Sequence, residues 1–503
     1  MLTEIISTPP PGSMLDWYLV TVTPQASQAS GRSGAIAAAH PEAVRAGLAA
    51  FEDGGGAVDA AIAAQAVLCV LMPEACGLGG DGMALVHKPG EAVVAVGGSG
   101  DAAARAPVAA SSGGASVTVP GVVAMWGELS RFAIRPLAEN LDRALDLCES
   151  GSSPPPATTE ARHAHRHRIE DGGGDGWAYI NATGPVPQPE LASVLELIGR
   201  AGTDAFYKSW PALAVAEAAQ KHGGFVEPDD LERIRVCSED AISVRWNGGL
   251  LAVQPPPSQG ILLAMSALWF EQRGGGVDTA DLDHLAIEAT EGAFAYRDDC
   301  AKGQALLDED LEVDEFRARR RGGPRSYLHT AGVATVDGQG TVVSSLVSVF
   351  DDFGSAVFVP ECGFMLNNRA GGFTTGMNAF APRARPVHTL APAILSSGSD
   401  VVALATPGAD GQVQTLLQLI LAKRYRGRSL ARAIGAPRWR SEGGRILIGE
   451  GHPSTDALAE RGHHVVPTPN ADQRMGAVVG AGMGSGQPFA MADWRRTTSC
   501  GAV

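Results

Sequence analysis

The stretch "SYLHTAGVATVDGQGTVVSSLVSVF" at residues 326–350 predicts two β-strands joined by a turn at 337–340, with Thr330 one residue before the first strand. Runs of β-branched and apolar residues on either side of a glycine-containing turn are typical of a β-hairpin. A threonine at the start of a strand is usually only a strand residue, because branched side chains favour extended backbone. The rest of the chain must decide whether Thr330 has a chemical role.

The composition is that of a folded, acidic protein. The 503 residues are 45% hydrophobic and include 63 Gly and 32 Pro, which indicates a turn-rich globular chain with a large core. A formal net charge of −16 repels phosphate backbones and anionic lipids, so we expect neither a nucleic acid nor a membrane as partner. The first twenty residues lack a basic region ahead of an apolar core, and the longest uncharged apolar run, 60–72, is too short to span a bilayer. We therefore expect a cytoplasmic protein.

Cysteine and histidine patterns give little support to a metal site. The seven cysteines are scattered, odd in number and without a CxxC pair, which fits reduced thiols. The tract "RHAHRHR" spaces His163, His165 and His167 by two, but its Pro/Ser/Thr-rich and Gly-rich flanks predict a solvated loop. We predict no metal ion and no cofactor, and the role of the histidine tract stays open.

The first part of the chain predicts helices followed by a glycine loop. "HPEAVRAGLAAFEDGGGAVDAAIAAQAVLCVLM" predicts two helices, the first ending near Glu52 and the second with Asp59 in its first turn. The loop "GLGGDG" at 77–82 precedes a strand and lacks the Lys-Ser/Thr of a P-loop, so it predicts tight backbone packing and not phosphate binding. The last third predicts strands near 341–350, 356–359, 363–367 and 400–405.

Several separated motifs follow one another in a recognisable order: "ACGLGGDGMALVH", "VQPPPSQGILL", "HTAGVATVDGQGTVVSS", "FGSAVFVPECGFMLNN", "RPVHTLAPAIL" and "ATPGADGQVQTLLQ". From about Ser30 to the C-terminus, this order resembles the γ-glutamyltransferase (γ-glutamyltranspeptidase) family. The resemblance implies an N-terminal nucleophile hydrolase, an α+β fold with a four-layer αββα sandwich, made as a precursor that cleaves itself. The implied cut between His329 and Thr330 separates a large subunit segment, 1–329, from a small one, 330–503, the two remaining intertwined as partners in one domain.

The resemblance implies a catalytic set built around Thr330. As the new N-terminal residue, Thr330 would be the nucleophile, and its α-amine, with a pKa of about 8, would be a base on the same residue. Before cleavage this nitrogen belongs to the peptide from His329, so we expect the precursor to be inactive. A second hydroxyl, which orients the nucleophile, falls on Ser348. The backbone N–H pair that stabilises the oxyanion falls on Gly408 and Ala409.

The implied substrate pocket departs from the family pattern. The arginine that grips the glutamyl α-carboxylate corresponds to Ala103, with Arg105 two residues out of register, and the acid that holds the α-ammonium corresponds to Gly372. Losing a charged contact costs about 2 to 5 kcal/mol, so we expect poor γ-glutamyl recognition. Other pocket positions of the family fall on the residues that we predict to bind the substrate here: Phe350, Arg369, His388 and Thr389.

The altered pocket predicts a small anionic substrate, with Arg369 and His388 as candidate anchors. Two structural alternatives stay open: Arg369 could pair with an acid such as Glu361 or Asp352, and His388 could be a packing residue. A retained threonine with a lost glutamate clasp resembles the family homologues in antibiotic pathways that make 4-alkyl-proline units of the lincomycin, hormaomycin and pyrrolobenzodiazepine types. That resemblance implies cleavage of a carbon-carbon bond in a pyrroline-carboxylate intermediate, with release of an oxalyl fragment.

Two other functions compete with this interpretation. One is an amide hydrolase or transferase that acts on a γ-glutamyl or other acyl donor. The other is a non-catalytic binding protein that keeps only the fold, against which the retained Thr330 argues.

Overall fold

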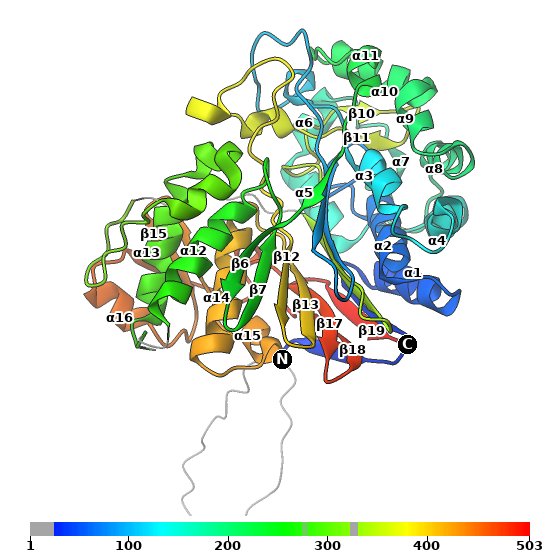
Figure 1. Cartoon of the computed structure of the whole chain (residues 1–503). Coiled ribbons are helices and arrows are strands. Elements are labelled where there is room, and N and C mark those ends of the chain that lie inside the picture. The colour runs from blue at the N-terminus through cyan, green and yellow to red at the C-terminus, as the bar shows by residue number, and fades with distance from the viewer. Residues whose placement is uncertain (1–24, 275–276, 279, 322–329) are drawn as a thin grey trace, which may run out of the picture.

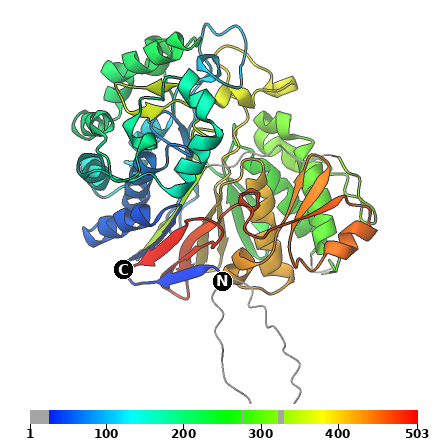
Figure 2. The ribbon, with the colours of Figure 1, turned by 180° about the vertical axis from the view of Figure 1, so that it is seen from behind.

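The fold consists of two β-sheets lying face to face between two layers of helices. A computed structural model describes residues 25–274, 277–278, 280–321 and 330–503. Each of the two sheets has seven strands, and the strand pairs within them are antiparallel. Figure 1 shows helices on opposite sides of the sheets, and Figure 2 shows the same layers from behind. The predicted α+β fold, a four-layer αββα sandwich, is confirmed.

Both sheets combine strands from before and after residue 330. In spatial order, the first sheet contains β19 (Ser499–Ala502), β2 (Gly34–Ala38), β8 (Ala331–Asp337), β9 (Val342–Ser348), β3 (Asp81–His87), β4 (Val94–Gly98) and β5 (Cys237–Asp240). The second contains β1 (Ser27–Ser30), β18 (Gln487–Ala492), β17 (Val479–Gly484), β13 (Asp400–Ala405), β12 (Ala393–Ser397), β7 (Gly249–Val253) and β6 (Ile242–Trp246). The segments on the two sides of residue 330 therefore share one core.

Helices pack on the outer face of each sheet, and a third apolar cluster lies between the sheets. The first sheet packs with α1 (Pro41–Glu52), α2 (Ala57–Leu71), α3 (Val122–Leu129), α4 (Leu137–Ser150), α8 (Pro189–Ala201), α9 (Asp204–Lys208), α10 (Trp210–Lys221) and α11 (Pro228–Glu232). The second packs with α12 (Gly260–Arg273), α13 (Leu282–Phe294), α14 (Gly411–Tyr425), α15 (Leu430–Gly435) and α16 (Thr455–Glu460). Within the described ranges, no helix has the length and apolar character needed to cross a membrane.

Smaller elements complete the chain. A separate sheet contains β14 (Trp439–Glu442), β15 (Arg445–Gly449) and β16 (Val465–Thr468). The strands predicted near 356–359 and 363–367 are short, because β10 (Phe358–Val359) and β11 (Phe364–Met365) form a two-stranded pair of two residues each.

The predicted ends of the first two helices are confirmed, since α1 ends at Glu52 and α2 carries Asp59 in its first turn. The Asp59 carboxylate closes the N-terminus of α2 and also binds the loop before α4. It accepts the backbone N–H groups of Gly56, Ile134 and Arg135 at 2.8, 2.9 and 2.9 Å. The whole of α2 is buried, so this carboxylate satisfies donors that water does not reach.

The predicted hairpin is confirmed as β8 and β9, at the centre of the first sheet. Asp337 closes the turn: its Oδ1 accepts the backbone N–H groups of Gln339 and Thr341, each at 3.0 Å. Gly340 has a φ of 90°, a left-handed conformation that favours glycine. The hairpin brings the start of β8 beside the end of β9, which places Thr330 next to Ser348.

The glycine loop at 77–82 packs tightly against backbone, as predicted. A Cβ at Gly79 would lie 2.2 Å from the carbonyl oxygen of Met365, and a Cβ at Gly80 would lie 2.5 Å from that of Ser348. Neither position has room for a side chain. This close approach sets the register that pairs Asp81 with Ser348 across β3 and β9.

The histidine tract is helical, so the predicted loop is wrong. His163 lies in α5 (Pro156–Ala164), His167 lies in α6 (Arg166–Asp171), and His165 lies between them. Pro156 occupies the start of α5, where a proline is favourable, so the proline-rich flank begins a helix. A spacing of two on a helix directs the three imidazoles to different sides, and His165 Nε2 lies 3.2 Å from a carboxylate oxygen of Asp352.

Candidate active site

Thr330 lies immediately before β8 and is 5% exposed. Its Oγ1 donates to Ser348 Oγ at 3.3 Å, and Ser348 is the last residue of β9. The two hydroxyls therefore meet at the open end of the central hairpin, as the resemblance implies. The preceding residue, His329, lies outside the described residues, so the cleavage site stays a prediction.

Ser348 is held by the backbone that follows it. Its Oγ accepts the N–H of Phe350 at 3.0 Å, and Phe350 has a φ of 86°. A positive φ is unfavourable for a bulky residue and is found where the surrounding structure enforces it, often at functional sites. The Ser348 hydroxyl oxygen thus accepts from the Phe350 amide on one side and from Thr330 Oγ1 on the other.

Gly408 and Ala409 precede α14, and both have a positive φ, 124° and 47°. Their carbonyl groups are fixed, because Gly408 accepts from Arg440 Nη1 at 3.1 Å and Ala409 accepts from Gln259 Nε2 at 3.0 Å. In the described part of the chain, neither backbone N–H donates to a protein group. Two such amides ahead of a helix N-terminus are suited to bind a developing negative charge.

A cavity of about 150 Å³ opens beside the nucleophile. Thr330 and Pro407 line it together, which brings the residue before Gly408 to the same space as the threonine hydroxyl. Arg495 and Arg496 line it as well, and neither was predicted from the sequence. The adjacent arginines in "DWRRTT" near the C-terminus were the available signal, but nothing in the local pattern places them near Thr330.

The two cavity arginines supply positive charge in an acidic protein. Arg495 Nη1 contacts an Asp493 oxygen at 3.0 Å, and Arg496 Nη2 donates to the carbonyl of Gln473 at 2.6 Å. Burial lowers the pKa of Arg495 and of Arg496 to about 10, so both guanidinium groups remain charged at neutral pH. An anion in the cavity would gain from this charge.

Arg369 and His388 share one buried acid, Asp81. Arg369 Nε lies 2.9 Å from Asp81 Oδ2, and His388 Nε2 lies 3.2 Å from the same oxygen. The His388 Nδ1 accepts the N–H of Leu390 at 3.1 Å, so the ring proton is on Nε2 and is donated to Asp81. Burial, and then the charge of Arg369, lower the pKa of His388 to about 4, which keeps the imidazole neutral at pH 7.

The ion-pair alternative for Arg369 is confirmed with Asp81, an acid that the sequence did not suggest. The Arg369 guanidinium also lies over the Phe350 ring, 4.3 Å from its centre. Thr389 lies next to His388, and its carbonyl accepts from Gln259 Nε2 at 2.8 Å. Phe350, Arg369 and His388 thus form one buried cluster directly beside Ser348.

Ala103, Arg105 and Gly372 mark the positions where the sequence is expected to depart from a glutamate-binding pocket. Ala103 is buried and offers no charge, while the nearby Arg105 is 76% exposed and pairs with Glu227 at 2.8 Å. A Cβ at Gly372 would meet Pro386 and the Val387 carbonyl, each at 3.3 Å. An acidic side chain at position 372 would need the neighbouring loop to move.

Comparison with known proteins gives the family context of this geometry. The family profile described as Gamma-glutamyltranspeptidase matches residues 43–320 and 314–503. An oxamate amidohydrolase proenzyme of Klebsiella pneumoniae is 30% identical, with 88% of this chain and 93% of that protein covered. The crystal structure of cephalosporin acylase from Bacillus halodurans is 25% identical, with a TM-score of 0.84 over 99% of both chains. The structure of LmbA2991HD is 24% identical, with a TM-score of 0.79 over 96% of this chain and 100% of the other. This likeness supports a shared fold and nothing further.

Proposed function

The chain belongs to the gamma-glutamyltranspeptidase family, and from this premise we propose that it is a self-processing threonine hydrolase that transfers a short anionic acyl group to Thr330. It is an enzyme of the N-terminal nucleophile class, because its relatives are proenzymes of hydrolases that match along almost the whole chain. The pairing of Thr330 Oγ1 with Ser348 Oγ, beside a cavity lined by two arginines, carries the proposal.

Self-cleavage uses the same hydroxyl as catalysis. Thr330 Oγ attacks the carbonyl carbon of His329, the C–N bond breaks, and the nitrogen becomes the α-amine of Thr330 while His329 is held as an ester. Water then hydrolyses the ester and releases the carboxylate of His329. The products are the segments 1–329 and 330–503, which share both sheets and so stay together as large and small subunits.

In turnover, the new α-amine accepts the proton of Thr330 Oγ as the oxygen attacks the substrate carbonyl. Ser348 orients the attacking oxygen, and the N–H groups of Gly408 and Ala409 stabilise the oxyanion. The leaving group takes the proton from the α-amine. Water then hydrolyses the acyl ester and regenerates Thr330.

The proposed acyl group is oxalyl or a close analogue. Oxamate carries its amide next to a carboxylate, so a threonine that cleaves it forms an oxalyl ester. Removal of an oxalyl fragment from a pyrroline-carboxylate forms the same ester, with an enamine-stabilised carbon as leaving group in place of nitrogen. An amide is the preferred bond, because a relative at 30% identity is named for oxamate hydrolysis. Carbon-carbon cleavage in natural-product biosynthesis is the second candidate, since the nucleophile and oxyanion site serve either leaving group.

The proposed substrate wall consists of Phe350, Arg369, His388 and Thr389, with Arg495 and Arg496 on the cavity side. A carboxylate adjacent to the reacting carbonyl lies close to the nucleophile, so the positive charge must also be close. The arginines near Thr330 meet this requirement. The charged head group of a γ-glutamyl substrate lies farther from the reacting carbonyl and needs charged side chains there. At the expected positions, Ala103 and Gly372 offer no charge.

Three substrates distinguish the alternatives: oxamate, an oxalyl-substituted pyrroline-carboxylate and γ-glutamyl-p-nitroanilide. We expect oxalate to form from at least one oxalyl compound with the wild-type protein, and not with Thr330→Ala, as measured by mass spectrometry of the products. Turnover of oxamate alone would support the amide hydrolase. Turnover of the pyrroline-carboxylate alone would support carbon-carbon cleavage. Turnover confined to the γ-glutamyl compound would refute the proposed acyl group.

A further inference from the structure

A second polar cluster lies where α13 meets residues 310–321, here called the strap, and the segment that follows α16. His284 and Glu288 are four residues apart on α13 and so share one face of the helix. His463 follows α16. One candidate ligand atom from each of these three buried side chains lies within 4.8 Å of the other two. Two imidazoles and a carboxylate are a donor set typical of zinc.

The hydrogen bonds of His284 present its Nδ1 to the cluster. Nε2 lies 2.9 Å from the carbonyl oxygen of Asp314, which can only accept, so the ring proton is on Nε2. Nδ1, which then has the lone pair, lies 2.8 Å from His463 Nε2. A histidine that binds a metal usually donates its other N–H to a carbonyl or carboxylate, which fixes the ring and its tautomer. His284 already has this arrangement.

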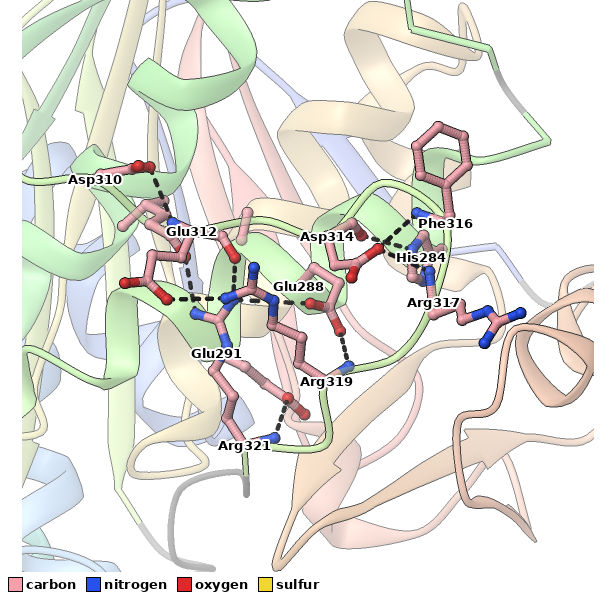
Figure 3. Close-up of polar contacts among 12 residues, drawn as sticks. His284, Glu288, Glu291, Asp310, Glu312, Asp314, Phe316, Arg317, Arg319 and Arg321 are labelled. Carbon is pink, nitrogen blue, oxygen red and sulfur yellow. Dashed lines mark hydrogen bonds and ion pairs between the residues drawn. The ribbon is translucent and has the colours of Figure 1, made fainter.

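Glu288 adds a buried oxygen that lacks a hydrogen-bond partner among the described residues. Its Oε1 accepts the backbone N–H of Arg319 at 3.0 Å, as Figure 3 shows, while Oε2 lies 3.8 Å from Arg321 Nη2. The Arg321 guanidinium donates to the carbonyl groups of Leu311 and Glu312. A buried carboxylate oxygen without a hydrogen bond is unfavourable, and a cation would remove that cost.

We propose that His284 Nδ1, His463 Nε2 and a carboxylate oxygen of Glu288 bind one divalent transition-metal ion, with zinc as the best match to the donor set. On binding, His463 takes the tautomer with its proton on Nδ1, and water completes the coordination. This site departs from the sequence-based expectation of no metal, and it lies apart from the histidine tract. Two of its ligands, His284 and His463, are 179 residues apart in the sequence.

The bound ion would join three parts of the structure. His284 and Glu288 both hold the strap, through the Asp314 carbonyl and the Arg319 N–H, and Glu291 on the same helix accepts the N–H of Arg321 at 3.1 Å. Figure 3 shows these contacts along one side of α13. His463 ties the segment after α16 to the same point. The role we assign to the ion is therefore structural: it holds the strap against α13.

Zinc binding by the full-length chain, prepared without a polyhistidine tag, tests this site. The protein is treated with EDTA, equilibrated with micromolar zinc chloride, and cleared of unbound ion. Bound zinc is then counted by plasma mass spectrometry, and the melting temperature is measured with and without zinc. We expect about one zinc per wild-type chain and a higher melting temperature with zinc.

Matched variants locate the ion. His463→Ala and Glu288→Gln should each lose the bound zinc and the thermal shift, while His464→Ala, which changes the exposed neighbour, should keep both. Glu288→Gln keeps an oxygen that can accept the Arg319 N–H, so it tests the metal even where His463→Ala fails to fold. A double variant, His163→Ala with His167→Ala, should also keep the zinc. The proposal is overturned where wild type retains no zinc, where Glu288→Gln and His464→Ala retain equal amounts, or where only the tract variant loses it.

Discussion

Replacing both members of the Arg369–Asp81 pair separates a structural role of Arg369 from a role in substrate binding. Both side chains are fully buried, and their N–O distance is 2.9 Å. Removing one partner of such a pair leaves a buried charge behind and costs about 3 to 5 kcal/mol. We therefore expect Arg369→Met to lower the free energy of unfolding by that amount, because Asp81 then keeps only the neutral His388 as its partner among the contacts described above.

The double variant Asp81→Asn with Arg369→Met removes both charges and leaves an amide oxygen that can accept the His388 N–H. We expect it to recover most of the lost stability, since replacing a buried ion pair by neutral groups is often neutral. If Arg369 also binds the substrate carboxylate, the double variant still loses about 2 to 4 kcal/mol of transition-state stabilisation, which is about 30- to 1000-fold in kcat/KM. Self-cleavage should survive, because the steps proposed for it use the Thr330 hydroxyl, the His329 carbonyl and water, and not Arg369 or Asp81.

The measurements are urea unfolding of the three variants, Asp81→Asn, Arg369→Met and the double, together with kcat/KM on the best oxalyl compound and gel analysis of processing. A double variant that regains both stability and wild-type kcat/KM would show that Arg369 is only a structural ion pair. The substrate carboxylate would then be assigned to the cavity arginines. A single variant as stable as wild type would refute the electrostatic reasoning itself.

Three further predictions concern processing, specificity and pH. Thr330→Ala should remain one uncleaved and inactive chain by intact-mass measurement, whereas wild type should give the segments 1–329 and 330–503; an active, full-length wild type would remove the nucleophile assignment. Glutathione and γ-glutamyl-p-nitroanilide should be poor substrates because Ala103 and Gly372 offer no charge, and a micromolar KM with rapid turnover on either would contradict the altered pocket. The folded pKa of His388 is about 4 against an ordinary 6.5, so its contribution to stability is fully present above pH 6.5 and is lost as the pH falls through 4. His388→Gln should therefore reduce the difference in unfolding free energy between pH 7 and pH 4.5 by about 2 to 3 kcal/mol, and an unchanged difference would place the titration elsewhere.

Local signals predicted the elements whose conformation depends on neighbours in sequence. The turn of the β8–β9 hairpin follows from Asp337 and Gly340, and the start of α2 follows from Asp59, because the contacts of Asp337 with Gln339 and Thr341, and of Asp59 with Gly56, join residues a few positions apart. The same kind of signal failed at Pro156, since a proline is equally compatible with a loop and with the first turn of a helix.

The sequence by itself determined the central hairpin and the first helix ends, which are readable along the chain, and the order of its motifs implied the αββα fold and the candidates Thr330 and Ser348 through the family resemblance. Only the tertiary structure decided what surrounds them. Asp81 lies 288 residues from Arg369 and reaches it because the register of β3 on β9 places Asp81 beside Ser348. Arg495 likewise lines the cavity of Thr330, and His463 contacts His284, although each pair is far apart in the sequence. Contacts of this kind depend on how sheets and helices pack, and residues so far apart carry no local pattern that reveals their approach.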